Sequence, residues 1–282
     1  TVKEATAGMR HGPVVFRTTK TKKAPTQHKH LLEKFAGNPI IRPNVENPWE
    51  NKATFNPAAL RDREKIHIVY RAIGDSDTSV LGYATSADGI NIEERLPYPI
   101  YARKGNITGQ HPLDLPPPIF YISGGGWNGG CEDPRLTRIG DNIYMLYTAF
   151  DGWGSLRIAL TSIKADDFRD RKWKWKEPVL ISPPGEVHKN WVIFPEKIKG
   201  KYAILHSISP KILIDYFDSL DDFDNENFIY SHYDGKPRKN AWDSHPRGAG
   251  PPPIKTAYGW LLLYHAIDHR DPGRYKLGAM IL

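Results

Sequence analysis

The sequence predicts an all-β protein built as a β-propeller, and three observations lead to this prediction. Helical periodicity is nearly absent after residue 36. Short runs rich in β-branched and aromatic residues alternate with Gly, Pro, Asn and Asp, and the 24 Pro and 24 Gly suit many tight turns. A proline-containing frame also recurs about every 60 to 75 residues, a period typical of propeller blades with about four strands each.

Each frame contains one strong strand signal. These signals are KIHIVYRAI (65–73), NIYMLYTAF (142–150), KYAILHSI (201–208) and GWLLLYHAI (259–267). In every frame a proline near a loop comes first, then a short strand, a polar or Gly turn, and this second strand. The first two frames share one spacing, because Tyr70 follows Pro57 by 13 residues and Tyr147 follows Pro134 by 13. A β-sandwich with unrelated hairpins is the alternative, and four matching frames favour the propeller.

We expect two parts in the chain, a basic extension at residues 1–36 and a propeller domain at residues 37–282. The extension holds eight basic and two acidic residues, a net charge of +6, whereas the rest holds 31 basic and 30 acidic residues, a net charge of +1. A solvated or partner-contacting tail explains this better than a nucleic-acid arm. The body has no zinc-finger spacing and no RRM-like aromatic signature, so we expect no nucleic-acid partner.

Composition and missing motifs exclude several classes of protein. No apolar run approaches the roughly 20 residues that cross a bilayer, so we expect no membrane partner. The single cysteine, Cys131, excludes an internal disulfide framework and a Cys-based zinc site, and we expect it to be a small buried residue. The sequence contains no GxSxG, P-loop, HExxH or GxGxxG followed by a helix. This argues against serine hydrolases, NTPases, zincins and dinucleotide enzymes.

The loops that begin the frames should meet around a central cavity, because equivalent loops of a repeat lie on one face. They and the nearby strand ends bring together Asn56, Arg71, Glu132, Asp133, Arg135, Glu196, Lys197, His206, Arg247 and His265. Carboxylates can act as acid or base, cations can hold anions, and Trp or Tyr rings can stack on a sugar. The set suits a sugar or polyol ligand.

Several of these residues have a purely structural interpretation as well. Asp133 precedes a proline and can cap a turn through its own backbone. Arg135 can simply pair with Glu132. For lone histidines such as His206 and His265, satisfied burial is the more common role.

The aromatic residues also have structural interpretations. We expect Tyr147 and Tyr264 in the core, since they stand in strands. Trp173 and Trp175 alternate with lysines in KWKWK, which predicts one face of an edge strand.

Six ordered motifs carry a resemblance to a known family. They are TFNPAAL, VYRAIG, YATSADG, GGCEDPRLTRIGDNIYMLYTAF, NWVIFPEKIKGKYAILH and RGAGPPPIKTAYGWLLLYHAID…RYKLGAMIL. Together they cover about residues 37 to 282 and resemble glycoside hydrolase family 130, the β-mannoside phosphorylases and β-mannosidases. The resemblance implies a five-bladed β-propeller. Four frames precede RYKLGAMIL, so we expect the fifth blade to be incomplete or absent in this chain.

The resemblance implies an inverting enzyme that cleaves β-mannosidic bonds of manno-oligosaccharides, with Asp133 of EDPR as the catalytic proton donor. In this family the acid is expected to act through a sugar hydroxyl, while phosphate or water attacks the opposite face of the anomeric carbon. Glu132 is expected to keep Asp133 protonated, because neighbouring like charges raise a carboxyl pKa. Phosphorolysis to mannose 1-phosphate is favoured. Hydrolysis and a non-catalytic sugar-binding propeller are the alternatives, and an intact EDPR argues against the latter.

Further roles follow for the remaining site residues. For substrate binding we expect Asn56, Arg71, Asp88, Glu132, Arg135 and His265. For phosphate binding we expect Arg71, Lys189, His206 and Lys211. Inorganic phosphate would be a co-substrate, and we expect no metal or other cofactor. A homo-oligomer and a cytoplasmic location would suit the family.

One position departs from the family pattern. Family phosphorylases usually place an Arg after the KYxxLH strand, where this chain has Ser207. The departure weakens phosphorolysis, since phosphate prefers a cluster of cations. Hydrolysis would instead need a carboxylate such as Glu186 or Glu196 to activate water.

Overall fold

A computed structural model describes residues 33–103, 126–231, 237–238 and 241–282. All of the expected basic extension except residues 33–36 lies outside these described residues. The elements are β1 (Ala53–Asp62), β2 (Lys65–Ile73), β3 (Ser79–Ser86), β4 (Glu94–Arg95), β5 (Gly130–Ile139), β6 (Asn142–Phe150), β7 (Leu156–Lys164), α2 (Ala165–Arg169), β8 (Val179–Leu180), β9 (Val192–Ile193), β10 (Tyr202–Ser207), β11 (Leu213–Phe217), β12 (His245–Ala249), β13 (Ile254–Thr256), β14 (Gly259–Asp268) and β15 (Asp271–Ile281). The expected all-β class is confirmed.

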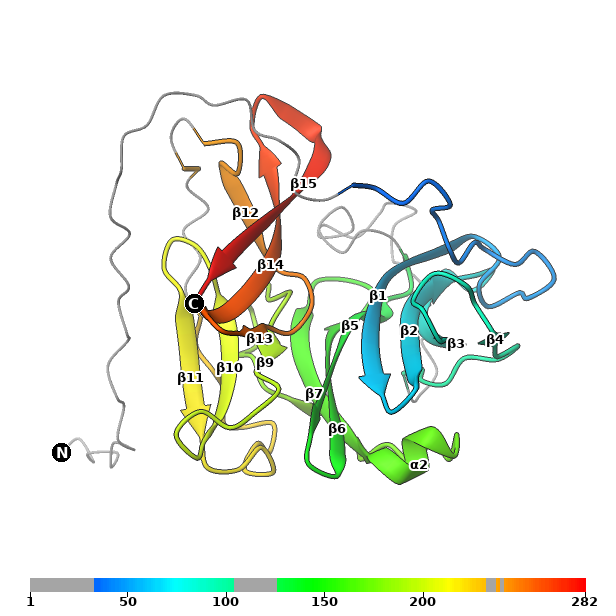
Figure 1. The fold of residues 1–282 in the computed structure, drawn as a ribbon, viewed down its shortest axis with the longest axis horizontal. Helices are drawn as coiled ribbons and strands as arrows, with labels where there is room; N and C mark the ends of the chain where they lie inside the picture. The colour runs from blue at the N-terminus through cyan, green and yellow to red at the C-terminus, as the bar shows by residue number, and fades with distance from the viewer. Residues whose placement is uncertain (1–32, 104–125, 232–236, 239–240) are drawn as a thin grey trace.

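The strands form four antiparallel units, shown in Figure 1. The first unit is β1–β4 and the second is β5–β8; the single parallel pair Ser79 and Gly130 joins them into one eight-stranded sheet. The third unit is β9–β11, a three-stranded sheet, and the fourth is β12–β15, a four-stranded sheet in which β12 and β13 both pair with β14. The predicted repeat of roughly four strands is therefore present as these units.

The four predicted strands are confirmed. KIHIVYRAI is β2 and NIYMLYTAF is β6, while β10 and β14 differ from prediction by no more than one residue at either end. The KWKWK segment is not a strand. Trp173 and Trp175 lie between β7 and β8 and pack edge-on against Phe168 of α2, with ring centroids 5.5 and 6.0 Å apart. Contact with the core therefore outweighs the alternating pattern.

Successive units pack face to face, and the hydrophobic core lies between them. The first and second units enclose Val69, Leu81, Met145 and Tyr147, the second and third enclose Leu146, Trp191 and Ile204, and the third and fourth enclose Phe194, Leu205 and Tyr264. Full burial of such a side chain contributes about 1.5–3 kcal/mol. The first strands also meet, since β1 contacts β5 and β5 contacts β9. Cys131, Tyr147 and Tyr264 are buried, as predicted.

Asp62, at the end of β1, links the first two units. Its buried carboxylate accepts a hydrogen bond from Arg169 of α2 at 2.7 Å and a second one from Arg138 of β5. Burial would raise the pKa of Asp62, but the hydrogen bond and positive charge of Arg169 and the charge of Arg138 outweigh it and lower the pKa. The carboxylate therefore stays charged and holds the two units together.

Tyr70 and Tyr264 occupy equivalent positions in the first and fourth units. The Tyr70 hydroxyl donates to Glu50 Oε2 at 2.8 Å, and the Tyr264 hydroxyl donates to Asp243 Oδ2 at 2.8 Å. Each ring also stacks with the tryptophan that precedes this acid, with centroids 6.4 and 6.2 Å apart. The two units thus repeat one local arrangement.

A glycine on the neighbouring strand makes room for each of these rings. Gly82 pairs with Tyr70, and Gly278 pairs with Tyr264. A Cβ atom at either glycine would overlap the tyrosine ring. The glycines are therefore part of the repeated arrangement.

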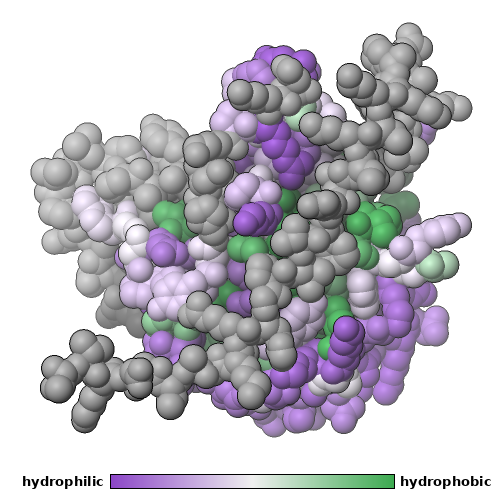
Figure 2. Space-filling view, turned by 90° about the vertical axis from the view of Figure 1, so that its left-hand side faces the viewer, coloured by the Kyte–Doolittle hydropathy of each residue, from purple (hydrophilic) through white to green (hydrophobic). Residues whose placement is uncertain are grey.

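The space-filling view in Figure 2 shows one face on which hydrophilic residues dominate and hydrophobic residues form smaller separate patches. Within the described ranges, no helix has the length and apolar character to span a bilayer.

Candidate active site

Each unit carries a residue with positive φ in its first strand or just before it. Asn56 (φ 46°), Asp133 (φ 51°) and Gly248 (φ 142°) lie beside register shifts in β1, β5 and β12, and Asn190 (φ 65°) lies just before β9. The left-handed region admits Asn, Asp and Gly far more readily than other residues. This explains the residue types found at the four positions.

These four residues contact one another in two pairs. Asn56 Nδ2 donates to Asp133 Oδ1 at 2.8 Å. A Cβ atom at Gly248 would lie 2.5 Å from Cβ of Asn190, so only glycine fits beside that side chain. Arg135 connects the pairs, because it donates to the main-chain oxygen of Asp133 at 3.1 Å and to Asn190 Oδ1 at 3.3 Å. All four units therefore contribute to one network.

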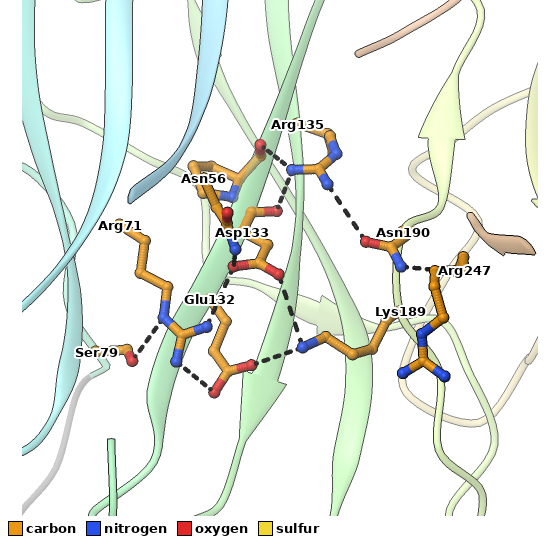
Figure 3. A network of polar contacts seen from close by, with 10 residues as sticks. Asn56, Arg71, Ser79, Glu132, Asp133, Arg135, Lys189, Asn190 and Arg247 are labelled. Atoms are coloured by element: carbon orange, nitrogen blue, oxygen red, sulfur yellow. Dashed lines mark hydrogen bonds and ion pairs between the residues drawn. The ribbon is translucent and has the colours of Figure 1, made fainter. Parts of the chain in front are cut away.

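A buried carboxylate pair lies at the centre of the network. Glu132 is fully buried and Asp133 is 7% exposed. Figure 3 shows the Arg71 guanidinium facing both, with NH2 3.0 Å from Glu132 Oε1 and NH1 3.2 Å from Asp133 Oδ1. Arg71 comes from β2 and its Nε donates to Ser79 Oγ at 3.0 Å. The rigid guanidinium fork holds the two acids in a fixed orientation.

Lys189 approaches the same pair from the segment before β9. Its Nζ lies 3.4 Å from Glu132 Oε2 and 3.7 Å from Asp133 Oδ2. Arg135 does not bind the Glu132 side chain; its NH1 instead donates to the main-chain oxygens of Asp133 and Pro134. The simple Arg135–Glu132 pair considered from the sequence is therefore not formed.

The protonation of the pair differs from the sequence-based expectation. Burial, followed by the charge of Asp133, raises the pKa of Glu132 to about 7 in spite of Arg71 and Lys189. Burial also acts to raise the pKa of Asp133, but Lys189, Arg71, Arg135 and the hydrogen bond from Asn56 outweigh it and lower the pKa. The opposite directions of the two pKa shifts contradict the expectation that Glu132 keeps Asp133 protonated. Three cations, Lys189, Arg71 and Arg135, favour the charged form of Asp133.

A cavity of about 270 Å³ adjoins the carboxylate pair on the side of Lys189. Its polar lining includes Lys189, Asn190, His206, Ser207 and Arg247, and none of the described residues that line it is Asp or Glu. His206 is buried, neither ring nitrogen has a hydrogen-bond partner within the described ranges, and Nε2 lies 3.7 Å from Asp215 Oδ2. The cavity is thus cationic and suits an anion. No cluster of three or more His, Cys, Asp or Glu side chains able to hold a metal occurs in the part of the chain that the structure describes.

Most of the residues selected from the sequence lie in or beside this network. Asn56, Arg71, Glu132, Asp133, Arg135 and Lys189 belong to it, and His206 and Arg247 line the cavity. His265 pairs across the strands with Gly248. Burial, then the charges of Arg135 and Arg247, lower the pKa of His265 to about 4, so it is neutral at physiological pH.

Two residues expected in the site lie elsewhere. Asp88 is exposed beyond the far end of β3 and accepts hydrogen bonds from the main-chain nitrogens of Ile90 and Asn91, both at 2.8 Å. Ser79, which touches Arg71, begins β3, so the strand rise places Asp88 roughly 20 Å or more away. Asp88 is a turn-capping residue. Lys211 is exposed between β10 and β11 and is not among the cavity-lining residues.

The loop residues of the third frame also lie apart from the cavity. Glu196 is exposed and pairs with Lys255 at 2.6 Å, and Lys197 lies over the Tyr202 ring at 4.3 Å. Of the two carboxylates considered as a base, Glu196 is therefore outside the site. Glu186 is half-exposed and bonds at 2.7 Å to His188, which lines the cavity.

Sequence reasoning missed Asn190 and Ser79. Asn190 bridges Arg135 and the main-chain oxygen of Arg247, to which its Nδ2 donates at 3.0 Å. The available signal was an Asn two residues before the third unit's first strand, comparable to Asn56 and Asp133 in the first two units. Ser79 carries no signal of its own in the sequence.

Comparisons with known proteins agree with the motifs. The family profile described as beta-1,4-mannooligosaccharide phosphorylase matches residues 116–282. A 1,2-beta-oligomannan phosphorylase of Thermoanaerobacter sp. (strain X514) is 38% identical over 260 residues, which covers 89% of this chain and 76% of the relative. A beta-1,2-mannobiose phosphorylase of the same organism is 34% identical over 264 residues, with the same coverage.

The fold also matches that of solved structures. One of them, which concerns glycoside hydrolases of the GH130 family that target beta-1,2 mannosidic linkages in Candida mannan, is 26% identical with a TM-score of 0.64. The match covers 88% of this chain and 75% of that structure. Sequence profile, relatives and fold agree, and this chain belongs to glycoside hydrolase family 130.

Proposed function

We propose that this chain is an inverting phosphorylase that cleaves β-mannosidic bonds of manno-oligosaccharides and releases mannose 1-phosphate. The relatives that are 38% and 34% identical support β-1,2-linked substrates. One structural observation carries the choice of phosphate as nucleophile: the cavity beside Asp133 is lined by cations and by no described carboxylate.

The reaction needs one acid and one nucleophile on opposite sides of the sugar. In this proposal a phosphate oxygen bonds to the anomeric carbon, the glycosidic carbon–oxygen bond breaks, and a proton from Asp133 reaches the leaving oxygen directly or through a sugar hydroxyl. An inverting hydrolase needs a second carboxylate, about 6.5–9.5 Å from the first, to activate water. Phosphate is already an anionic nucleophile and needs cations to hold it. Lys189 and Arg247 would supply them, and His206 lines the same cavity.

Lys189 connects phosphate binding to the acid. It touches both carboxylates and also lines the cavity. A phosphate in that cavity would share the Lys189 charge and would weaken its hold on Asp133, which raises the pKa of Asp133. Glu132, whose pKa is about 7, lies next to it as a store of the proton. In this proposal phosphate therefore helps to bring the acid into its protonated form.

For the fold we propose the five-bladed propeller of the family. Support comes from the face of the fourth unit that points away from the third. On β15 this face carries Tyr275, Leu277 and Ile281, which are 64%, 56% and 52% exposed, and on β14 it carries the half-buried Leu261 and Leu263, which pair with Ile281 and Ala279. The outer face of the first unit is covered by residues 40–49. A further blade would cover the open apolar face of the fourth unit.

Hydrolysis is the second candidate. Ser207 stands where the family phosphorylases usually place an Arg, and a family structure that is 26% identical concerns hydrolases. In this case His206, with Asp215 at 3.7 Å behind its ring, would be the base that activates water.

Product analysis separates the two candidates. The purified protein would be incubated with β-1,2- and β-1,4-mannobiose, each with and without inorganic phosphate. Phosphate-dependent mannose 1-phosphate would support phosphorolysis. Free mannose formed at the same rate without phosphate would establish hydrolysis, and no product from either disaccharide would contradict both.

A further inference from the structure

A second cavity, larger than the cationic one, lies apart from the carboxylate network. Its volume is about 480 Å³, within the range of about 300–1,000 Å³ that is typical of small-molecule sites. It lies at the seam of the first and second units, where segment 100–103 faces β5, β6 and the segment between β7 and β8. Cys131 lines this cavity, whereas the next residue, Glu132, faces Arg71. Because successive side chains of a strand point to opposite faces, β5 separates the two sites.

Aromatic rings form much of the wall. Four of them, Tyr101, Tyr147, Trp173 and Trp175, come from three separate segments of the chain. Tyr101 packs edge-on against Tyr147 and Trp175, with centroids 5.4 and 5.6 Å apart, and its hydroxyl lies 3.2 Å from that of Tyr147. Edge-on packing is a preferred geometry of aromatic pairs, so the rings support one another in this arrangement. The hydroxyl pair adds a polar spot to this apolar surface.

The charged groups of the lining are mostly bound to other parts of the protein. Arg157 Nε donates to the main-chain oxygen of Ser182 at 2.8 Å. Lys176 pairs with Asp221 at 2.9 Å, and Asp151 accepts three main-chain N–H groups of its own turn. The cavity therefore offers ring surfaces and hydroxyl groups with no dominant charge. Such a surface suits a neutral ring with an apolar face and a hydroxylated edge, which describes a pyranose.

We propose that this cavity is a second carbohydrate site, which binds a neutral β-linked manno-oligosaccharide independently of the cationic cavity. The identity of the sugar rests on the proposed function, but the site itself rests on the aromatic wall. It differs from the first site in chemistry: the first holds cations for an anion, and the second holds aromatic rings for a neutral sugar.

Fluorine NMR of the 5-fluorotryptophan-labelled protein tests the proposal. The Asp133→Asn variant, which should bind without turnover, would be titrated with β-1,2-mannobiose and β-1,2-mannotriose. The chain has 8 Trp. Trp173 and Trp175 line the second cavity and Trp191 lines the first, so their resonances, assigned by Trp→Phe substitution, report the two sites separately. We expect saturable shifts of the Trp173 and Trp175 resonances, at a midpoint sugar concentration that differs from that of the Trp191 resonance.

A blocking variant makes the test specific. Ala102 is exposed and lines the second cavity, so Ala102→Phe should fill it without disturbing the core. It should weaken the sugar affinity measured from the Trp173 and Trp175 resonances at least tenfold. In the protein that retains Asp133, the same substitution should change the turnover rate by no more than about twofold. Static Trp173 and Trp175 resonances, or shifts that persist in Ala102→Phe, would overturn the second site. Shifts there without any turnover of mannobiose by the wild type would uphold the second site and overturn the proposed function.

Discussion

Lys189 Nζ lies 3.4 Å from Glu132 Oε2, and this contact joins the third unit to a carboxylate that the second unit carries. The same side chain lines the cationic cavity. Because Nζ also lies 3.7 Å from Asp133 Oδ2, one cation touches both the expected proton donor and the space that the nucleophile would fill. Its removal should affect both.

Lys189→Met should lower kcat/KM for phosphate by about 100- to 1,000-fold, the usual cost of losing one preorganised charge in a site. Lys211→Met is the matched control, since Lys211 is exposed and outside the cavity lining, and it should change kcat/KM by less than about twofold. Initial rates at varied phosphate check this. Equal losses in the two variants would contradict the assignment of the cavity.

Asp133→Asn should lower kcat by about 100- to 10,000-fold, the usual contribution of a general acid. Asn tolerates the φ of 51° at this position, so the fold should persist. Steady-state rates measure the loss of kcat, calorimetry measures the binding of β-1,2-mannobiose, and thermal unfolding shows whether the fold persists. A variant that unfolds at the same temperature, binds sugar and retains wild-type kcat would eliminate Asp133 as the acid.

Glu132 should make the free energy of unfolding depend on pH. The folded chain holds the Glu132 proton up to about pH 7, whereas an unfolded glutamate releases it near pH 4.5. More protons are then bound in the folded state, so this stabilising contribution is full below pH 4.5 and is lost as pH rises to about 7. Denaturant unfolding of wild type and Glu132→Gln across this range checks the sign. Parallel pH profiles would show that Glu132 titrates normally.

Asp62→Ala should lower the free energy of unfolding by about 1–3 kcal/mol, because it leaves Arg138 and Arg169 without the carboxylate that joins the units. Asp166→Ala is the control, since Asp166 is 85% exposed, and it should change stability by about 0.5 kcal/mol or less. Urea unfolding measures both. Similar small effects would mean that Asp62 does not tie the units together.

Gly278→Ala should cost about 1–3 kcal/mol of unfolding free energy, because the added methyl group overlaps the Tyr264 ring. Gly273→Ala lies on the same strand with nothing within 4 Å of the added Cβ, and it should change stability by about 0.5 kcal/mol or less. Thermal or urea unfolding compares the pair. If Gly278→Ala is as stable as Gly273→Ala, the glycine has no special part in the repeat.

One strand of each unit (β2, β6, β10 and β14) was predictable because it has an apolar composition between clear turn signals. KIHIVYRAI and NIYMLYTAF match β2 and β6 in full. The structure of the KWKWK segment was not predictable, because its indoles pack on Phe168, which is close in space but belongs to α2. A local pattern of alternation contains no information about such a partner.

For the site, the EDPR motif and its resemblance to the family selected Glu132, Asp133 and Arg135, and the structure places all three in one polar network. Asp88 was misplaced because an Asp-Gly pair that caps a turn has the same letters as one that faces a ligand. The order of the two pKa values was also beyond prediction. It depends on Lys189 and Arg71, which lie 56 and 62 positions from Asp133 in the sequence and meet it only in the folded chain.

The left-handed backbone conformation at Asp133 restricts which acidic residue can occupy this position. Aspartate and asparagine adopt a φ near 51°, the value at Asp133, more readily than longer side chains such as glutamate. The equivalent positions of the other units hold Asn56, Asn190 and Gly248. One base change separates an asparagine codon from an aspartate codon, so a repeated turn that first accepted asparagine for its shape would need a single nucleotide substitution to acquire a proton donor.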